Sequence, residues 1–142
     1  MSVENQSAGI VIIGAGLAGW HVVDAIRAKD KDIPITLITA DNGDRYHKPM
    51  LTMAISQQKN AADLVRATGS DAAKAANINL LANTQVTDID PASQTVQLIS
   101  ALRLDPVYTN YATISYDKLV LAMGAHPIFP TSLPEDLVWH VN

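Results

Sequence analysis

Apolar and polar positions along the first forty residues follow the order strand, helix, strand. Residues 9–13 form a short apolar run that stops at a glycine, which is typical of a strand buried on both faces. Residues 17–29 follow a helical period, and residues 34–39 (PITLIT) predict a second strand before a turn at 41–44 (DNGD). The expected apolar face of the helix carries Ala18, Val22, Ala25 and Ile26. Together these segments predict a β-α-β unit over residues 10–41.

The rest of the chain predicts short helices followed by strands. Residues 48–76 are polar and rich in alanine, which favours two or three short helices. Strand-like runs follow at residues 79–82, 85–89, 95–99, 112–115 and 118–122. We expect the runs at 95–99 and 112–115 to belong to a small antiparallel meander. Strands alternating with helices, followed by a meander, predict a layered α/β fold.

Composition restricts the class of protein. The 142 residues suffice for one domain with a core, and 48% hydrophobic with 17% charged residues are typical of a globular protein. The net charge of -4 comes without a basic stripe, so we expect no nucleic-acid partner. No apolar run is long enough to span a bilayer, and none has the basic flank of a signal peptide. We therefore expect a cytoplasmic protein without membrane insertion.

Cysteine is absent from the sequence. Its absence excludes disulfides, cysteine-ligated metal centres and thiol redox pairs within these residues. We expect no metal site of any kind. Any redox chemistry would have to come from a bound cofactor.

The strongest motif is Gly14-Ala15-Gly16-Leu17-Ala18-Gly19, placed between the first strand and the helix. Gly14 permits a tight turn, Gly16 lets the backbone approach a pyrophosphate, and Gly19 allows the helix to pack closely on the strand. The helix N-terminus then offers free N–H groups to the phosphates. A glycine turn without a ligand is the alternative, but the flanking elements favour a dinucleotide site.

Asp41 lies at the end of the second strand, 22 residues after Gly19. An acid at this place accepts hydrogen bonds from ribose hydroxyls in dinucleotide-binding units. The alternative is an aspartate that only forms the turn before Asn42 and Gly43. Arg45 is the nearest cation, but its place in the loop does not suggest a 2′-phosphate site.

Two further segments gain meaning only in combination. In residues 46–52 (YHKPMLT), a lysine beside a proline in a loop is on its own best explained as a solvated residue. Residues 116–125 (YDKLVLAMGA) predict a buried strand that runs into a glycine turn, where ligands of open α/β sheets gather.

These segments together resemble the N-terminal part of FAD-dependent pyridine-nucleotide oxidoreductases, and within them rubredoxin–NAD(+) reductases. The most specific similarity is ITADNG at 38–43 followed by YHKPMLT at 46–52, continuing through QVTDID at 85–90. The resemblance runs from Ile10 to about Asn142. It implies a three-layer FAD/NAD(P)-binding (Rossmann-like) α/β domain with a small antiparallel β-meander.

The resemblance also implies roles for individual residues. Asp41 would bind the adenosine ribose, where the family often has glutamate, and Lys48 would stabilise charge on the reduced flavin ring as the catalytic residue. Pro49 would pack beside the ring. The FAD pyrophosphate would be lined by Gly14, Ala15, Gly16, Leu17 and Ala18, with Gly19 completing the motif.

Later positions match as well, with two departures. The backbone of Val86 would meet the adenine, and Ala122 and Gly124 would lie near the dinucleotide. Met123 stands where many relatives have threonine. The cysteine pair of the disulfide-reductase branch is missing, which favours reductases that pass electrons to a protein carrier.

The activity implied by the resemblance is electron transfer from NADH through FAD to rubredoxin, in a chain that serves alkane hydroxylation. Alternatives are an FAD-dependent ferredoxin reductase, a nitrite-reductase flavin domain, or a non-catalytic nucleotide-binding module. No second Gly-x-Gly-x-x-Gly follows the first. We therefore expect residues 1–142 to be a truncated, N-terminal part of the FAD-binding domain, without the NADH-binding and C-terminal interface domains and inactive alone.

Overall fold

The computed structural model describes residues 8–46, 50–54, 56–100 and 111–125. Its centre is a parallel four-stranded sheet in the order β5-β2-β1-β9. The strands span Ile10–Ile13 (β1), Ile35–Ile38 (β2), Asn79–Leu81 (β5) and Lys118–Leu121 (β9). All three strand pairs of this sheet are parallel. The predicted β-α-β unit is therefore confirmed, and β1 lies at the middle of the sheet.

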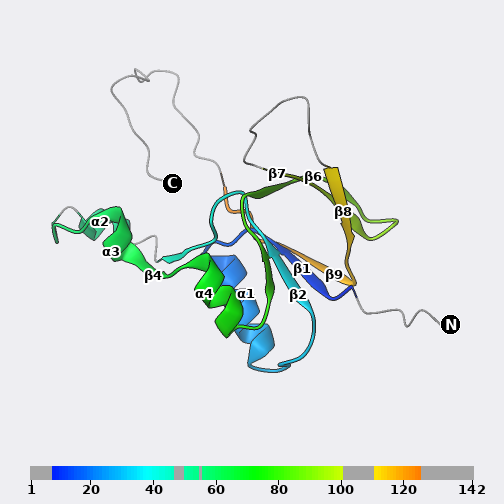
Figure 1. Ribbon diagram of the computed structural model, residues 1–142, viewed down its shortest axis with the longest axis horizontal. Helices are drawn as coiled ribbons and strands as arrows, with labels where there is room; N and C mark the ends of the chain where they lie inside the picture. The colour runs from blue at the N-terminus through cyan, green and yellow to red at the C-terminus, as the bar shows by residue number, and fades with distance from the viewer. Residues whose placement is uncertain (1–7, 47–49, 55, 101–110, 126–142) are drawn as a thin grey trace, which may run out of the picture.

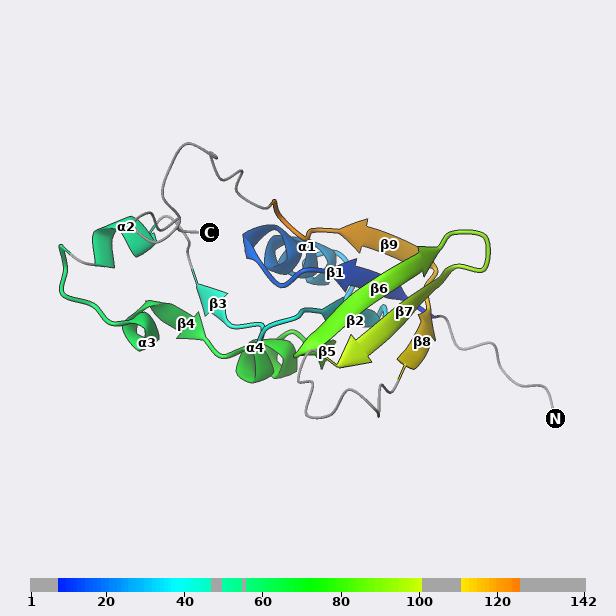
Figure 2. The same cartoon turned by 90° about the horizontal axis from the view of Figure 1, so that it is seen from above.

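Two further layers cover the sheet (Figure 1). The helices α1 (Leu17–Arg27) and α4 (Gly69–Ala75) lie on one face. The antiparallel sheet of β6 (Thr84–Asp90), β7 (Thr95–Ser100) and β8 (Tyr111–Ser115) lies on the other face (Figure 2). This arrangement is the three-layer α/β fold with a β-meander that the sequence predicts.

Each strand of the central sheet sends alternate side chains into two cores. Ile12 and Leu37 are fully buried against the helices, together with Val23 of α1. Val11 and Ile38 face the meander instead and pack with its buried residues. Successive strand residues point to opposite faces, so a continuous apolar run fills both cores.

The inner face of α1 agrees with the prediction only in part, because Val22 and Ile26 pack against the core as expected. Gly19, Trp20 and Val23 are the buried residues, whereas Ala18 and Ala25 are exposed. Alanines give a weak periodic signal because their side chains are equally compatible with either face. The larger apolar area of Trp20 and Val23 determines which face is buried.

The described part of the segment between the first β-α-β unit and β5 contains three short α-helices, in agreement with the prediction. They are α2 (Leu51–Ala54), α3 (Ala61–Leu64) and α4. The sequence did not indicate the two-stranded antiparallel sheet of β3 (Arg45–Tyr46) and β4 (Val65–Ala67). Among the described residues, no helix is long and apolar enough to cross a membrane.

The turn between β6 and β7 is held by Asp90. Its carboxylate accepts hydrogen bonds from the Ser93 hydroxyl and from the N–H groups of Ser93 and Ala92. These bonds, led by the Ser93 hydroxyl, hold the pKa of Asp90 below its ordinary value. The turn therefore forms around an ionised carboxylate at neutral pH.

Two glycines let α1 begin directly on the sheet. Gly14 has φ +104°, a left-handed conformation, and a Cβ there would lie 2.3 Å from the Ala122 carbonyl oxygen of the chain after β9. A Cβ on Gly19 would lie 1.9 Å from the Gly14 carbonyl oxygen. The predicted roles of these two glycines, a tight turn and close helix–strand packing, are confirmed.

We expect Gly19→Ala to destabilise the fold by about 2–3 kcal/mol, because α1 would have to move away from β1 to admit the methyl group. Gly16→Ala is the matched control. Gly16 has φ -72°, and a Cβ there would meet nothing within 4 Å, so we expect a loss of at most about 1 kcal/mol. Urea unfolding followed by circular dichroism measures both changes. Equal losses would contradict the packing role of Gly19.

Candidate functional site

A long cleft opens where β1 and β2 end. It has a volume of ≈ 780 Å³ and is lined by Ile13, Gly14, residues 38–41, residues 84–89 and Met123. The central sheet contributes the carboxyl ends of its strands to one wall, and β6 contributes the other wall. Ligands of open α/β sheets bind in crevices at this end of the strands.

Three of the site residues predicted from the sequence line this cleft: Gly14, Asp41 and Val86. They follow or belong to three different elements, β1, β2 and β6. Met123 adds an exposed side chain beside Gly14. The fold thus brings together the residues expected to contact pyrophosphate, ribose and adenine, although more than 70 positions separate the first from the last.

Asp41 uses one carboxylate oxygen to build the turn. Its Oδ1 accepts hydrogen bonds from the Thr39 hydroxyl at 2.7 Å and from the Gly43 N–H at 2.9 Å. Its Oδ2 makes no hydrogen bond with any residue that the structure describes. The turn-forming role that the sequence left open is therefore real, and it leaves a second oxygen of this exposed carboxylate for a ligand.

The wall formed by β6 contains a β-bulge. Val86 pairs with Leu98 and Asp88 pairs with Gln97, so Thr87 is an extra residue on this strand. A bulge bends a strand and increases its twist, and bulges are common beside binding sites. The bulge lies within the cleft-lining part of β6, where it shapes the wall beside Val86.

The N-terminal end of α1 follows Gly14, which lines this cleft. Gly16 caps the helix without any side-chain hydrogen bond, and the first turn contains no acidic residue. The N–H groups of the first turn and the positive end of the helix dipole remain for an anion. The space beside Gly16 is open, since a Cβ there would meet nothing within 4 Å. This end of the helix accordingly fits a diphosphate group.

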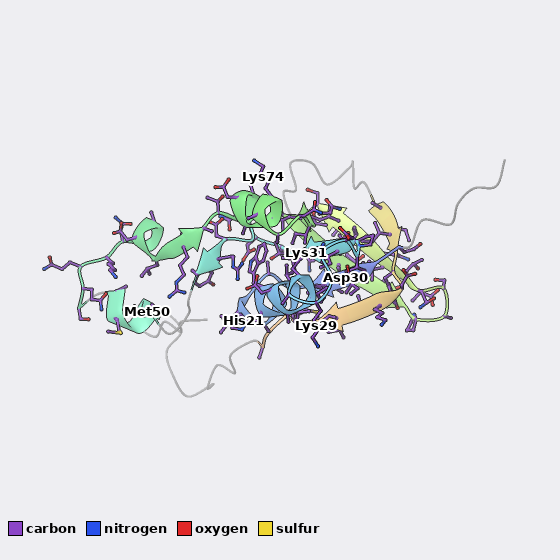
Figure 3. The ribbon with its side chains drawn as sticks, turned by 90° about the horizontal axis from the view of Figure 1, so that it is seen from below. His21, Lys29, Asp30, Lys31, Met50 and Lys74 are labelled. Carbon is purple, nitrogen blue, oxygen red and sulfur yellow. The ribbon has the colours of Figure 1, made fainter. Side chains whose placement is uncertain are left out.

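A small pocket of ≈ 100 Å³ lies on the other side of the glycine loop. Ala15, Gly16 and Leu17 form one wall, and residues 44–46 with Arg66 form part of the other. Figure 3 shows His21, another lining residue, on the first half of α1. The loop therefore separates two hollows, one beside Asp41 and one beside the strands β3 and β4.

The other predicted site residues that the structure describes line neither of these two hollows. Ala122 donates its N–H to the Ile13 carbonyl at 2.8 Å, and its own carbonyl oxygen faces Gly14. Gly124 turns the chain with φ +74°. Ala18 is exposed on α1 and Gly19 is buried against the loop. Lys48 and Pro49 lie outside the described residues, so their predicted contacts with a flavin ring stay predictions.

Arg45 has a structural role. Its guanidinium forms an ion pair with Asp24 of α1 and lies over the Trp20 ring, 4.9 Å from the ring centre. Trp20 in turn donates its indole N–H to the Gly43 carbonyl at 3.1 Å. These contacts keep Arg45 on the helix side of the turn, consistent with the expectation that it reads no 2′-phosphate.

Some residues around the cleft were not found from the sequence. Thr39 is the buried polar residue, 8% exposed, whose hydroxyl holds the Asp41 carboxylate. Gln85 and Asp88 line the cleft through the geometry of β6. The threonine at the end of PITLIT gave a weak signal, since a polar residue closing an apolar strand marks its end. Arg66, which lines the small pocket, gave no signal in the sequence, because its strand was not predicted.

Comparison with known proteins gives consistent results. The sequence profile of the family described as pyridine nucleotide-disulphide oxidoreductase matches residues 8–141. The nitric oxide reductase FlRd-NAD(+) reductase of Shigella dysenteriae is 40% identical over 137 residues, which is 96% of this chain and 33% of that protein. The chain thus spans about a third of the length of the curated relatives it matches.

Solved structures agree with this result. The putidaredoxin reductase–putidaredoxin complex is similar with a TM-score of 0.69 and 33% identity over 86% of this chain and 27% of that one. NADH:rubredoxin oxidoreductase from Clostridium acetobutylicum has a TM-score of 0.62 and 30% identity over 85% of this chain and 29% of that one. On the fold, the glycine loop and these matches, the chain belongs to the pyridine nucleotide-disulphide oxidoreductase family.

Proposed function

We propose that this chain is the FAD-binding portion of an NADH oxidoreductase that delivers electrons to rubredoxin. The observation that carries the proposal is the convergence of Gly14, Asp41 and Val86 on one cleft next to an uncapped helix N-terminus. The family is FAD-dependent, and relatives at 40% identity are named as FlRd-NAD(+) reductases.

The chain's own residues would bind and orient the cofactor. Asp41 would accept hydrogen bonds from the ribose hydroxyls through Oδ2, and the first-turn N–H groups after Gly16 would receive the diphosphate. The β6 backbone at Val86 would border the adenine. FAD, when bound, supplies the hydride and electron-transfer chemistry that this cysteine-free chain lacks. Lys48 would stabilise negative charge at the flavin.

The first test is titration of the purified chain with FAD, followed by the change in flavin fluorescence. We expect saturable binding, and we expect Gly16→Ala to weaken it about tenfold or more, since a methyl group would occupy the open space beside the loop and each 1.4 kcal/mol lost is a factor of ten. The unfolding curve shows that the variant is folded. A wild-type chain that does not take up FAD would refute the proposal for this segment.

The same titration separates the proposal from its non-catalytic alternative. A flavin site binds FAD more tightly than ADP, because the flavin half adds contacts. A nucleotide-sensing module would bind ADP as tightly as FAD. Competition between the two ligands on the wild-type chain decides between these functions.

Asp41→Asn tests the ribose contact without removing the turn. The amide oxygen of asparagine can still accept the bonds from Thr39 and Gly43, while its NH₂ group replaces the ligand-facing acceptor. We expect an unchanged midpoint of unfolding and about tenfold weaker FAD affinity, because hydrogen bonds to a charged acceptor are among the stronger ones. Calorimetric titration measures the affinity. Unchanged affinity would assign Asp41 to the turn alone.

The proposal also names the protein that accepts electrons from the flavin. The relatives' names support rubredoxin-type carriers, whereas the similar putidaredoxin reductase structure supports a ferredoxin-type carrier. The FAD-loaded chain should be reduced chemically and mixed with oxidised rubredoxin or ferredoxin. We expect faster oxidation of the flavin by rubredoxin. A preference for ferredoxin would favour the alternative function.

A separate prediction concerns whether NADH can reduce FAD bound to this chain. Within residues 1–142 the Gly-x-Gly-x-x-Gly motif occurs once, so we expect dithionite but not NADH to bleach FAD bound to this chain. Absorption spectra after each addition test this.

The reaction that the electrons finally serve also stays a proposal. Alkane hydroxylation follows from the resemblance, whereas the names of the relatives refer to nitric oxide reductase.

A further inference from the structure

The small pocket beside the glycine loop contains a cation that no structural role explains. Arg66 is the middle residue of β4 and lines this pocket together with Gly16 and Leu17 of the loop and helix start. Its side chain is exposed. No hydrogen bond or ion pair of Arg66 occurs with any residue in the described part of the chain. An arginine in this situation carries its full charge and its donors toward the pocket.

The other charged groups that the structure describes in this pocket are already used. The Arg45 guanidinium is paired with Asp24 and stacked on Trp20. The Asp44 carboxylate accepts bonds from the Gly69 N–H at 2.8 Å and from the Asn42 amide at 2.8 Å. Asp44 is therefore held by the turn, and among the described lining residues the charge of Arg66 is left over on this side of the loop.

The position of Arg66 is set by the sheet that the sequence did not predict. Its neighbours Val65 and Ala67 pair with Tyr46 and Arg45 of β3. This pairing brings β4, which lies about 50 positions after the glycine loop, to the start of α1. The register of the two strands shifts at this point, so Arg66 is an extra residue on β4 between two paired neighbours.

From this placement we infer that Arg66 is a positioning residue for the phosphate part of the dinucleotide, opposite the N–H groups that follow Gly16. The inference rests on the proposed function. Guanidinium groups bind phosphates through paired, charge-assisted hydrogen bonds, and the N-terminus of α1 offers partial positive charge from the other side. An anion between them is attracted by both. In this arrangement the glycine loop lets the phosphates approach the backbone. Arg66 adds a full positive charge to the partial positive charge at the N-terminus of α1.

The test is FAD titration of Arg66→Gln, Arg66→Lys and the wild-type chain at low and high ionic strength. We expect Arg66→Gln to bind FAD about five- to tenfold more weakly at low salt, with a smaller difference at high salt, because an exposed charge acts through a screened field. Arg66→Lys keeps the charge and should lie within about threefold of the wild type. Both substitutions are at an exposed position, and melting curves check that the fold is retained.

The matched control is Lys29→Gln, which removes the same charge at the far end of α1. Figure 3 shows Lys29 at the opposite end of this helix from His21. The 11 residues of α1 correspond to about 16 Å, which is beyond the screening length of roughly 8 Å in physiological salt. Lys29→Gln should bind FAD as the wild type does.

The outcomes separate the two proposals. Wild-type affinity in Arg66→Gln at low salt, or an equal loss in Arg66→Gln and Lys29→Gln, would overturn the role of Arg66 while leaving FAD binding intact. An equal loss at every ionic strength in both Arg66 variants would also overturn it, since the effect would then not be electrostatic. A wild-type chain that binds no FAD would refute the proposed function itself, and the role of Arg66 with it.

Discussion

The close contact between Gly19 and the Gly14 carbonyl determines where everything else at the site can lie. With only hydrogen at Gly19, α1 starts directly above the end of β1, and a methyl group would come within 1.9 Å of that oxygen. The helix is then held in place by Val23 and Trp20, which are buried in the core beneath it. Its N-terminal N–H groups consequently face the edge of the sheet where the cleft opens.

A second constraint acts through the turn after β2. Its residues are connected to three elements: Asp41 to the end of β2 through Thr39, Gly43 to α1 through Trp20, and Asp44 to α4 through the Gly69 N–H. The turn therefore cannot move without shifting the helix layer. The Asp41 carboxylate is therefore preorganised, which would lower the entropy lost on the ribose contact that we propose.

Sequence reasoning was most successful where one residue type serves one geometric need. The glycine spacing predicted the loop, because only glycine tolerates the φ of Gly14 and the contact at Gly19. The uninterrupted apolar strands predicted a sheet covered on both faces, which the two cores confirm. For Asp41 the sequence left two roles open, a ribose contact and a turn. The hydrogen bonds of Oδ1 confirm the turn, and the ribose contact stays a prediction.

Other features depend on tertiary contacts and left no pattern to recognise. The strands β3 and β4 have two and three residues, too few for an alternating pattern to be distinguished from a loop. The bulge at Thr87 depends on the register of β6 against β7, which is set by pairing across the sheet rather than by any single residue. On α1 the prediction was right for Val22 and Ile26 and wrong for Ala18 and Ala25, because alanine gives little periodic signal.

The large cleft and the small pocket differ in the charge of their lining residues. Among the described residues that line the large cleft, the charged side chains are Asp41 and Asp88, both acidic. The small pocket across the glycine loop is lined by Arg45, Arg66 and Asp44. Arg45 is paired with Asp24 and Asp44 is held by the turn, so the remaining charge there is the positive charge of Arg66. A dinucleotide has neutral hydroxyl donors at its ribose and negative charge at its phosphates, so under the proposed function the two ends of the site would attract different parts of one ligand. Reversing the ligand would place phosphate oxygens against two carboxylates, which is unfavourable. The charges would thus favour the orientation that we propose for the cofactor, with the adenosine in the cleft and the phosphates at the N-terminus of α1.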